Sequence, residues 1–115
     1  MIEAIASNSH PAGMSLKPES MLPQEVAQAM RNEAVGHRLS LLRRAIGKSP
    51  SEMADMLDIE RTYWSRFEKG RQGLSDTVAA LLVIRLGVTL DWLVLGRWDK
   101  LPLDLAEKIR SLPPE

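Results

Sequence analysis

The amino-acid sequence predicts an all-α fold. Apolar residues recur at the spacing of a helix face along most of the chain, and no strand is apparent. The most informative stretch runs from Ser49 to Arg71, which predicts two short helices joined by a tight turn. With 115 residues, of which 44% are hydrophobic, the chain is long enough for one domain plus tails. We therefore expect a small helical bundle that contains this helical pair.

The N-terminal part divides into a leader and the first helices. Residues 1–23 contain Ser, Asn, Pro, Gly and Met without periodicity, so we expect a flexible leader and assign it no function. The main domain is expected over residues 24–96. It begins with a short helix over residues 24–31, which we expect Gly36 to separate from the first helix of the bundle. The stripe by which that bundle helix packs on the rest consists of Val35, Leu39, Leu42 and Ile46.

The first helix of the central pair has a well-defined start. Ser49 can cap it with its hydroxyl, Pro50 fits the first helical position, and Glu52 completes a capping box. Its apolar face consists of Met53, Ala54 and Leu57. These features predict a helix that begins near Pro50 and buries one side.

The turn and the second helix of the pair follow directly. We expect Asp58 to adopt a left-handed backbone in the turn, with Ile59 filling the angle between the helices. The second helix is expected over about residues 60–69 and ends at Gly70. Its apolar side carries Trp64 and Phe67. Its remaining sides carry Arg61, Thr62, Tyr63, Ser65 and Arg66.

These polar side chains are of the types that read DNA bases. Arginine bonds bidentately to guanine, Ser and Thr hydroxyls donate or accept, and the methyl group of Thr contacts that of thymine. Two short helices in this layout form a helix-turn-helix, in which the second helix enters the major groove. The pair therefore predicts a DNA-reading element.

Two further helices complete the domain. Ser75 is expected to cap the fourth bundle helix, and Thr89 to cap a fifth, which packs through Leu90 and Leu93. The fourth helix extends to about residue 86, and its apolar face consists of Val78, Leu81, Leu82 and Leu86.

Residues 97–115 form a C-terminal tail with a sixth, amphipathic helix begun by Pro102. The apolar side of this helix consists of Leu101, Leu105, Ile109 and Leu112. Two arrangements are open. The helix folds back on its own bundle, or it pairs with its copy in a second subunit, because reading a palindrome requires recognition helices roughly 34 Å apart.

The chain resembles the Xre family, the helix-turn-helix type of phage repressors and Cro, over roughly residues 35–96. The resemblance rests on residues before, within and after the motif. They are Arg38-Leu39, Leu42-Arg43, Gly47, Glu52-Met53-Ala54, Leu57, Ser65-Arg66-Phe67-Glu68-Lys69-Gly70-Arg71 and Leu86-Gly87-Val88-Thr89-Leu90-Asp91-Trp92-Leu93. The last run, followed by Leu95-Gly96, is frequent in that family and much less expected by chance.

The resemblance implies a five-helix, lambda-repressor-like bundle whose third helix lies in the major groove. The implied base contacts are Arg61, Thr62, Tyr63, Arg66 and Ser65. The implied phosphate contacts are Ser49, Pro50 and Ser51 before the second helix, and Lys69 and Arg71 after the third. A structural ion pair is implied between Arg43 and Glu68, which also places Arg43 close to the DNA backbone.

Three features slightly favour a different role. Pro50 stands where the family often has Gln, Glu60 stands where it favours Ser or Thr, and the formal net charge is zero. Between His37 and Arg71, however, basic residues outnumber acidic ones, which predicts a local positive face. The alternative is a protein-interaction module on the same fold, such as the antitoxin of a toxin pair. An antitoxin commonly also binds its own promoter, so the two interpretations overlap.

Composition argues against several other classes. Cysteine is absent, which excludes disulfides and thiolate metal sites. His10 and His37 sit in no recognisable nucleophile or metal arrangement, so we expect neither an enzyme nor a metal or cofactor site. No apolar segment is long enough to span a bilayer, and the N-terminus lacks the pattern of a secretion signal, so we expect a cytoplasmic protein.

We therefore interpret the chain as a sequence-specific transcriptional regulator, a repressor of the phage or prophage type. It would bind a palindromic operator on double-stranded DNA as a homodimer, and the bound dimer would repress by covering the promoter.

Overall fold

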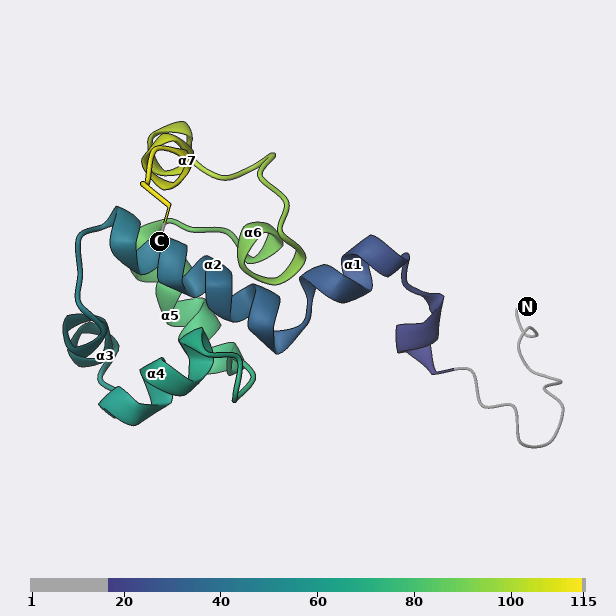
Figure 1. The fold of residues 1–115 in the computed structure, drawn as a ribbon, viewed down its shortest axis with the longest axis horizontal. Coiled ribbons are helices and arrows are strands. Elements are labelled where there is room, and N and C mark those ends of the chain that lie inside the picture. The colour runs from purple at the N-terminus through teal and green to yellow at the C-terminus, as the bar shows by residue number, and fades with distance from the viewer. Residues whose placement is uncertain (1–16, 115) are drawn as a thin grey trace, which may run out of the picture.

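Helices make up the regular structure of this chain (Figure 1). The computed structural model describes residues 17–114, and no strand occurs among them. A 3-10 helix, η1 (Pro18–Met21), is followed by seven α-helices in this range. They are α1 (Gln24–Ala29), α2 (Asn32–Ala45), α3 (Pro50–Leu57), α4 (Arg61–Glu68), α5 (Asp76–Leu86), α6 (Leu90–Leu95) and α7 (Leu103–Arg110). The all-α prediction is confirmed, and α1 and α7 extend the chain beyond a five-helix bundle.

Local side-chain caps set where three of these helices begin. The hydroxyls of Ser75 and Thr89 accept hydrogen bonds from the backbone N–H groups of Val78 and Trp92, at 3.2 and 3.1 Å. Each bond satisfies a helix N–H that has no partner within the helix. Ser49 caps α3 in the same way. The predicted starts of α3, α5 and α6 are therefore confirmed.

The hydrophobic core surrounds α2, which packs against α4, α6 and α7 (Figure 1). Its predicted stripe is buried at Val35, Leu39 and Leu42 and half-buried at Ile46. The largest fully buried side chains are Trp64, Trp92, Leu39, Leu42, Met53, Leu57, Leu82, Leu93 and Val88. The prediction of a core position was wrong for Leu90, which is 51% exposed because it lines a surface groove at the start of α6.

The sequence predicted that Gly36 separates two helices, and this was wrong. Gly36 lies inside α2. A Cβ atom added there would stand 2.4 Å from the carbonyl oxygen of Phe67 and 2.6 Å from that of Glu68. The C-terminal end of α4 therefore crosses α2 in direct backbone contact. Only a residue without a side chain permits this approach, which is why a helix-weakening glycine occupies the position.

The C-terminal helix α7 folds back on its own bundle, and this decides between the two arrangements that the sequence left open. Leu101, Leu105 and Ile109 are buried, and Leu112 is half-buried. α7 contacts α2, and the Arg44 guanidinium donates to the Pro113 carbonyl at 2.7 Å. The apolar side of α7 is thus covered within the chain and is not available to a second subunit.

Two tryptophans and an arginine hold the connection between α6 and α7. Trp98 meets the buried ring of Trp92 edge to face, with centroids 5.7 Å apart and an interplanar angle of 70°. The Arg110 guanidinium, from the end of α7, lies over the Trp98 ring, 4.5 Å from the ring centroid. Such aromatic and cation–π contacts fix the approach of the two segments beyond simple burial.

Arg38 of α2 binds the ends of two neighbouring helices. Its Nε donates to the Leu93 carbonyl at 2.9 Å, and its Nη2 donates to the carbonyls of Val94, at 3.1 Å, and of Ala29. Burial lowers the pKa of this guanidinium, which remains a cation and so suits carbonyls at the negative ends of α6 and α1. The C-terminal end of α1 is thereby fixed to the bundle.

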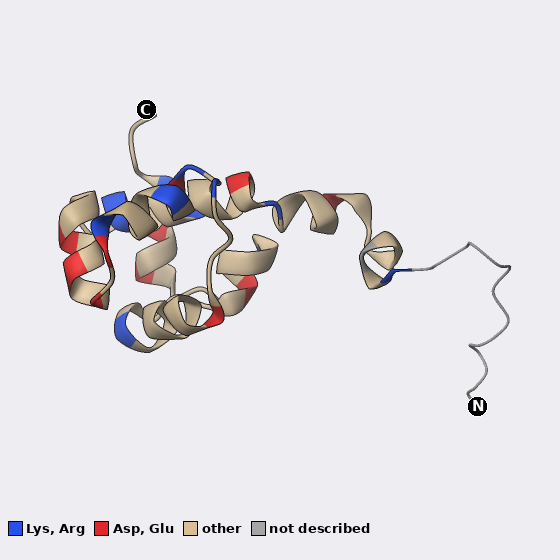
Figure 2. Ribbon diagram, turned by 90° about the horizontal axis from the view of Figure 1, so that it is seen from below, with Lys and Arg blue, Asp and Glu red and all other residues tan. Residues whose placement is uncertain are grey.

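The remainder of the N-terminal part projects from the bundle (Figures 1 and 2). We call residues 17–29 the arm. Residues 1–16 of the expected leader lie outside the described residues, whereas η1 forms a short 3-10 turn that the sequence did not predict. The Lys17 carbonyl accepts the Ser20 hydroxyl at 2.8 Å, a local bond that supports this turn. α1 contains no buried residue.

Candidate nucleic-acid interface

The pair α3 and α4 starts from a complete capping box. The Ser49 hydroxyl accepts from the Glu52 N–H at 3.1 Å, and the Ser49 N–H donates to the Glu52 carboxylate at 2.9 Å. Pro50 occupies the first helical position, where its missing N–H costs nothing. The predicted start of α3 is therefore confirmed in each of its parts.

The turn between the two helices also has the predicted conformation. Asp58 has φ 56° and ψ 45°, a left-handed backbone, and it is the only non-glycine residue with positive φ between residues 17 and 114. Ile59 is half-buried and packs against the core. This turn brings α3 and α4 into contact through the buried faces that carry Met53, Ala54, Leu57, Trp64 and Phe67.

The outer side of α4 presents most of the predicted base-reading residues. Trp64 and Phe67 are buried on the inner side. The exposed residues of the helix are Arg61, Thr62, Tyr63 and Arg66, and Ser65 is half-buried. Because burial of the two aromatic rings fixes the rotation of α4, it also fixes which side chains face outward.

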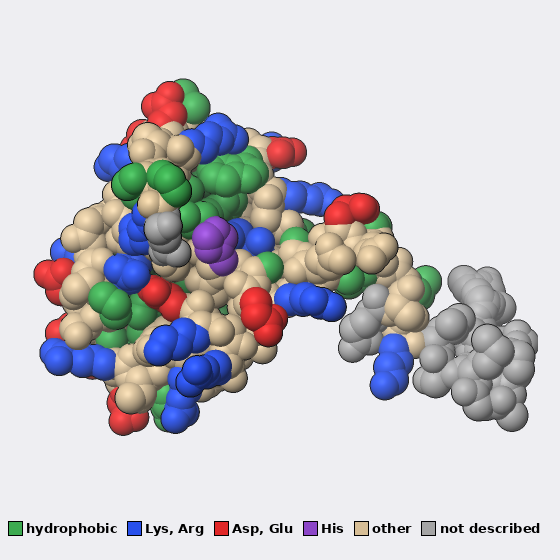
Figure 3. Space-filling view, viewed as in Figure 1, with side chains coloured by type: hydrophobic (Ala, Val, Ile, Leu, Met, Phe, Trp, Pro, Cys, Tyr) green, Lys and Arg blue, Asp and Glu red, His purple; other side chains and the backbone are tan. Residues whose placement is uncertain are grey.

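A shallow depression brings the predicted base-reading and phosphate-binding residues together. It has a volume of about 190 Å³ and is lined by Thr62, Ser65, Arg66, Lys69 and Arg71. Three cationic side chains thus border two hydroxyls. Figure 3 shows Lys and Arg side chains gathered over this part of α4, while Figure 2 shows acidic residues interspersed elsewhere on the helices. The depression is a positively charged, hydrogen-bonding surface of the kind that contacts DNA.

Arg61 and Tyr63 do not line this depression. Arg61 lies at the start of α4, where its Nη2 stands 3.5 Å from an oxygen of Asp55 on α3. Both side chains are exposed, so this pair is weak and screened by salt. Tyr63, 42% exposed, is the large apolar side chain on the outer surface of α4. The structure therefore places Thr62, Ser65 and Arg66 in the depression and leaves Arg61 and Tyr63 outside it.

The N-terminus of α3 is less open to a phosphate than the sequence indicated. Four N–H groups at a helix start have no partner within the helix. At α3, Pro50 lacks one, and the capping box engages those of Ser49 and Glu52, which leaves the Ser51 N–H. The hydrogen bonds from Ser49 lower the pKa of Glu52, so a carboxylate stands at this end. The Ser51 N–H is therefore the backbone donor that this helix start can offer to a phosphate.

The predicted ion pair joins α2 to the end of α4. Arg43 Nε lies 2.5 Å from Glu68 Oε2, and Arg43 Nη2 lies 3.2 Å from Oε1, a bidentate arrangement. Arg43 also donates to the Lys48 carbonyl at 2.9 Å, which ties the loop before α3 to the same group. Both side chains of the pair are mostly buried.

Trp64 is a third member of this network, and the sequence reasoning missed it. Its Nε1 donates to Glu68 Oε2 at 2.5 Å. The spacing of four residues, which places both side chains on one helix face, was the available indication. The Glu68 carboxylate thus joins α2 to the core of α4, and Arg43 adds the loop before α3, so the reading helix is held rigidly.

Comparison with known proteins agrees with this geometry. Residues 34–93, more than half of the 115-residue chain, match the family described as helix-turn-helix domain. No protein of curated function and no solved structure is significantly similar to the chain. The match begins in α2, covers the pair α3 and α4, and ends in α6.

Two further observations concern the described residues alone. Between residues 17 and 114, no helix is long and apolar enough to cross a membrane. In the same range no group of His, Cys, Asp or Glu side chains is arranged to hold a metal ion. The family match, together with the turn and the outer side of α4, shows that this chain belongs to the helix-turn-helix domain family of DNA-binding proteins.

Proposed function

We propose that the chain is a sequence-specific transcriptional regulator of the Xre type, a repressor that binds a palindromic operator as a homodimer. The observation that carries this proposal is the outer side of α4, where hydroxyls and guanidinium groups lie beside the cations that follow the helix. A helix with this surface fits the major groove with its polar side toward the base edges.

The base-reading residues in this proposal are Arg61, Thr62, Tyr63, Ser65 and Arg66. In this proposal Arg66 bonds to guanine from the depression, and Thr62 and Ser65, which line the same depression, supply hydroxyls. Arg61 would exchange its exposed contact with Asp55 for a base or a phosphate. Each well-formed contact contributes about 1–3 kcal/mol of discrimination between bases.

The phosphate contacts are unequal. Lys69 and Arg71 lie exposed at the end of α4 with no acidic side chain among the residues that line their depression. At the start of α3, Ser51 offers its N–H and hydroxyl, and Ser49 its hydroxyl, but the Glu52 carboxylate opposes an approaching phosphate. We therefore assign the stronger backbone contacts to Lys69 and Arg71, and the weaker ones to Ser49 and Ser51.

A dimer is part of the proposal because one subunit has a modest positive surface. In one subunit only Lys69 and Arg71 are assigned as the stronger phosphate contacts, so few counterions are released when that subunit binds. Two subunits on a palindrome double the contacts and place both α4 helices on one side of the duplex, roughly 34 Å apart. Repression would follow from coverage of the promoter.

Selection of bound duplexes from a random DNA library tests the proposal. The full chain is compared at near-physiological salt with a double variant, Arg61→Ala with Arg66→Ala. A matched control, Arg97→Ala with Lys100→Ala, removes the same charge from exposed positions outside the depression. We expect the wild type and the control to enrich one palindrome that the double variant loses.

Other outcomes overturn defined parts of the proposal. Enrichment of a site without two-fold symmetry would retain DNA reading and remove the dimer. Absence of any enrichment would remove DNA reading, and the search would turn to a protein partner such as a toxin.

A further inference from the structure

The arm carries apolar side chains that its own bundle does not cover. Met21 is 76% exposed and Leu22 is 38% exposed, and α1 has no buried residue. Exposed apolar residues scattered singly are ordinary, but here they lie on one projecting segment (Figure 1). Burial of these side chains against another surface would lower the free energy.

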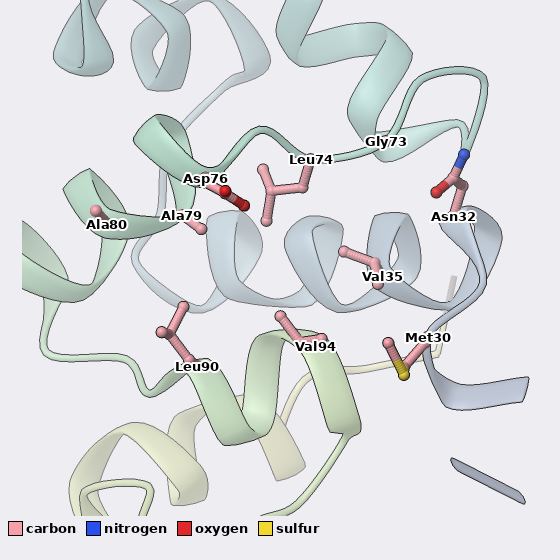
Figure 4. A pocket seen from close by; sticks show the side chains of 10 residues that line it. All are labelled: Met30, Asn32, Val35, Gly73, Leu74, Asp76, Ala79, Ala80, Leu90 and Val94. Carbon is pink, nitrogen blue, oxygen red and sulfur yellow. The ribbon is translucent and has the colours of Figure 1, made fainter. Parts of the chain in front are cut away.

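A groove with an apolar lining opens where the arm joins the bundle. Its volume is about 370 Å³, and Figure 4 shows α2 as its floor, with α5 and the preceding loop on one side and α6 on the other. Met30 lies at one end, beside the start of α2, and Leu90 and Ala80 lie at the other. Asp76 is the only charged residue in the lining. The groove has the size and composition of an uncovered binding site for apolar side chains.

The arm of the same chain is held away from this groove. Arg38 donates to the Ala29 carbonyl at the end of α1 and to the Leu93 carbonyl of α6, so α1 and α6 are fixed relative to each other. From Ala29 back toward its N-terminus, α1 extends away from the bundle, and η1 lies farther out (Figures 1 and 2). η1, which contains Met21, therefore lies away from the groove of its own chain.

We propose that the groove receives the arm of a second copy of this chain, with Met21 and Leu22 as the inserted side chains. The exchange is reciprocal, because each copy has one arm and one groove, and it closes as a two-fold dimer. Lys17 at the start of the arm, four residues before Met21, is exposed and supplies a charge opposite to Asp76, whereas Glu25 on α1 carries the same charge as Asp76. This inference deepens the proposed homodimer by naming its interface, and it rests on that proposal for its role in DNA reading.

The groove is compatible with DNA binding by both subunits. None of its lining residues borders the depression on α4. The residues that an arm in the groove would contact are therefore not those that line the depression.

Sedimentation equilibrium of the full chain tests the interface. Met21→Glu places a charge on the arm, and Leu90→Glu places one in the groove. Each change should weaken the dimer at least about tenfold, since an apolar contact is replaced by a buried charge. The matched control is Leu103→Glu, because Leu103 is 70% exposed on α7 and lies outside the groove. A wild type that stays monomeric, or a dimer that survives both changes, overturns the inference.

Cross-linking identifies the two partners directly, because the chain contains no cysteine. A mixture of Met21→Cys and Ala80→Cys chains, treated with a short bismaleimide, should give a cross-linked heterodimer, whereas Met21→Cys with Leu103→Cys should not. In a chain that carries both Met21→Cys and Ala80→Cys, a link within one chain at high dilution would show that the arm folds back, which overturns the inference. A monomer that still selects one DNA half-site would end this inference while leaving DNA reading intact.

Discussion

Gly36 shows how a single residue sets the position of the reading helix. Its missing side chain lets the last carbonyls of α4 rest against α2, and the Arg43–Glu68 pair stands at the same crossing. The crossing determines how far α4 projects from the bundle. Residues that contact no DNA therefore contribute to where the reading side chains lie.

Replacement of Gly36 by Ala should destabilise the protein by about 2–3 kcal/mol, because backbone atoms cannot yield as a flexible side chain can. Helix propensity alone predicts the opposite sign, since Ala is favoured over Gly inside a helix by about 1 kcal/mol. Gly47→Ala is the control: it has open space around it and suffers only the strain of its positive φ. Urea denaturation of both variants decides, and a Gly36→Ala protein as stable as the wild type would contradict the crossing.

Arg66 and Arg71 should respond differently to replacement by Ala. Loss of Arg66 should cost on the order of 1–3 kcal/mol at one base position and relax specificity there. Loss of Arg71, a phosphate contact, should weaken binding to all sequences alike and reduce the salt dependence. Titration of each variant with a selected duplex and with random DNA separates the two. An equal loss on both duplexes for Arg66→Ala would remove its assignment as a base reader.

At the level of elements, α3 shows the balance between helix stability and phosphate binding. Its capping box stabilises the helix start, and it engages the N–H groups of Ser49 and Glu52, which a phosphate would otherwise use. The Glu52 carboxylate is the charged part of that box. Its protonation should therefore weaken the start of α3.

The hydrogen bonds from Ser49 lower the pKa of Glu52 below its ordinary value of 4.5 in the folded chain. The carboxylate therefore stabilises the fold above that ordinary value, and this contribution is lost as the pH falls through the lower, folded pKa. We expect the stability difference between wild type and Glu52→Gln to shrink from pH 6 to pH 3. Urea denaturation across this range measures it, with Glu107→Gln as a control for the loss of one exposed carboxylate. A difference that grows toward low pH would contradict the sign.

On the scale of the whole molecule, α7 belongs to the core of the domain. The side that could have joined two subunits instead covers α2, and Trp98 and Arg110 close the connection. Among the described residues, the arm and the groove remain apolar surfaces that the bundle does not cover.

A chain that ends after Gly96 should lose stability, because α7 is packed on its own bundle. Leu101, Leu105, Ala106 and Ile109 are buried against the bundle, and removal of one such side chain costs about 2–5 kcal/mol when it leaves a cavity. Thermal denaturation by circular dichroism should show a marked decrease in Tm. If the shortened chain keeps its Tm, the packing of α7 does not stabilise the bundle.

Much of the fold could be predicted because its determinants are local. The starts of α3, α5 and α6 follow from Ser49, Ser75 and Thr89, whose hydroxyls bond to groups three residues away. The outward side of α4 follows from the spacing of Trp64 and Phe67. The donors left at the start of α3 follow from the same local box, because its two bonds engage the N–H groups of Ser49 and Glu52.

The sequence by itself determined most of the helices, the starts of α3, α5 and α6, and the side of α4 that faces outward, because caps and helical periodicity act between residues close along the chain. Only the tertiary structure decided how surfaces from distant segments meet. It placed Gly36 under the end of α4, joined Trp64 to the Arg43–Glu68 pair, and folded α7 onto α2. The physical reason is that an apolar face specifies that it must be buried and leaves open which surface buries it.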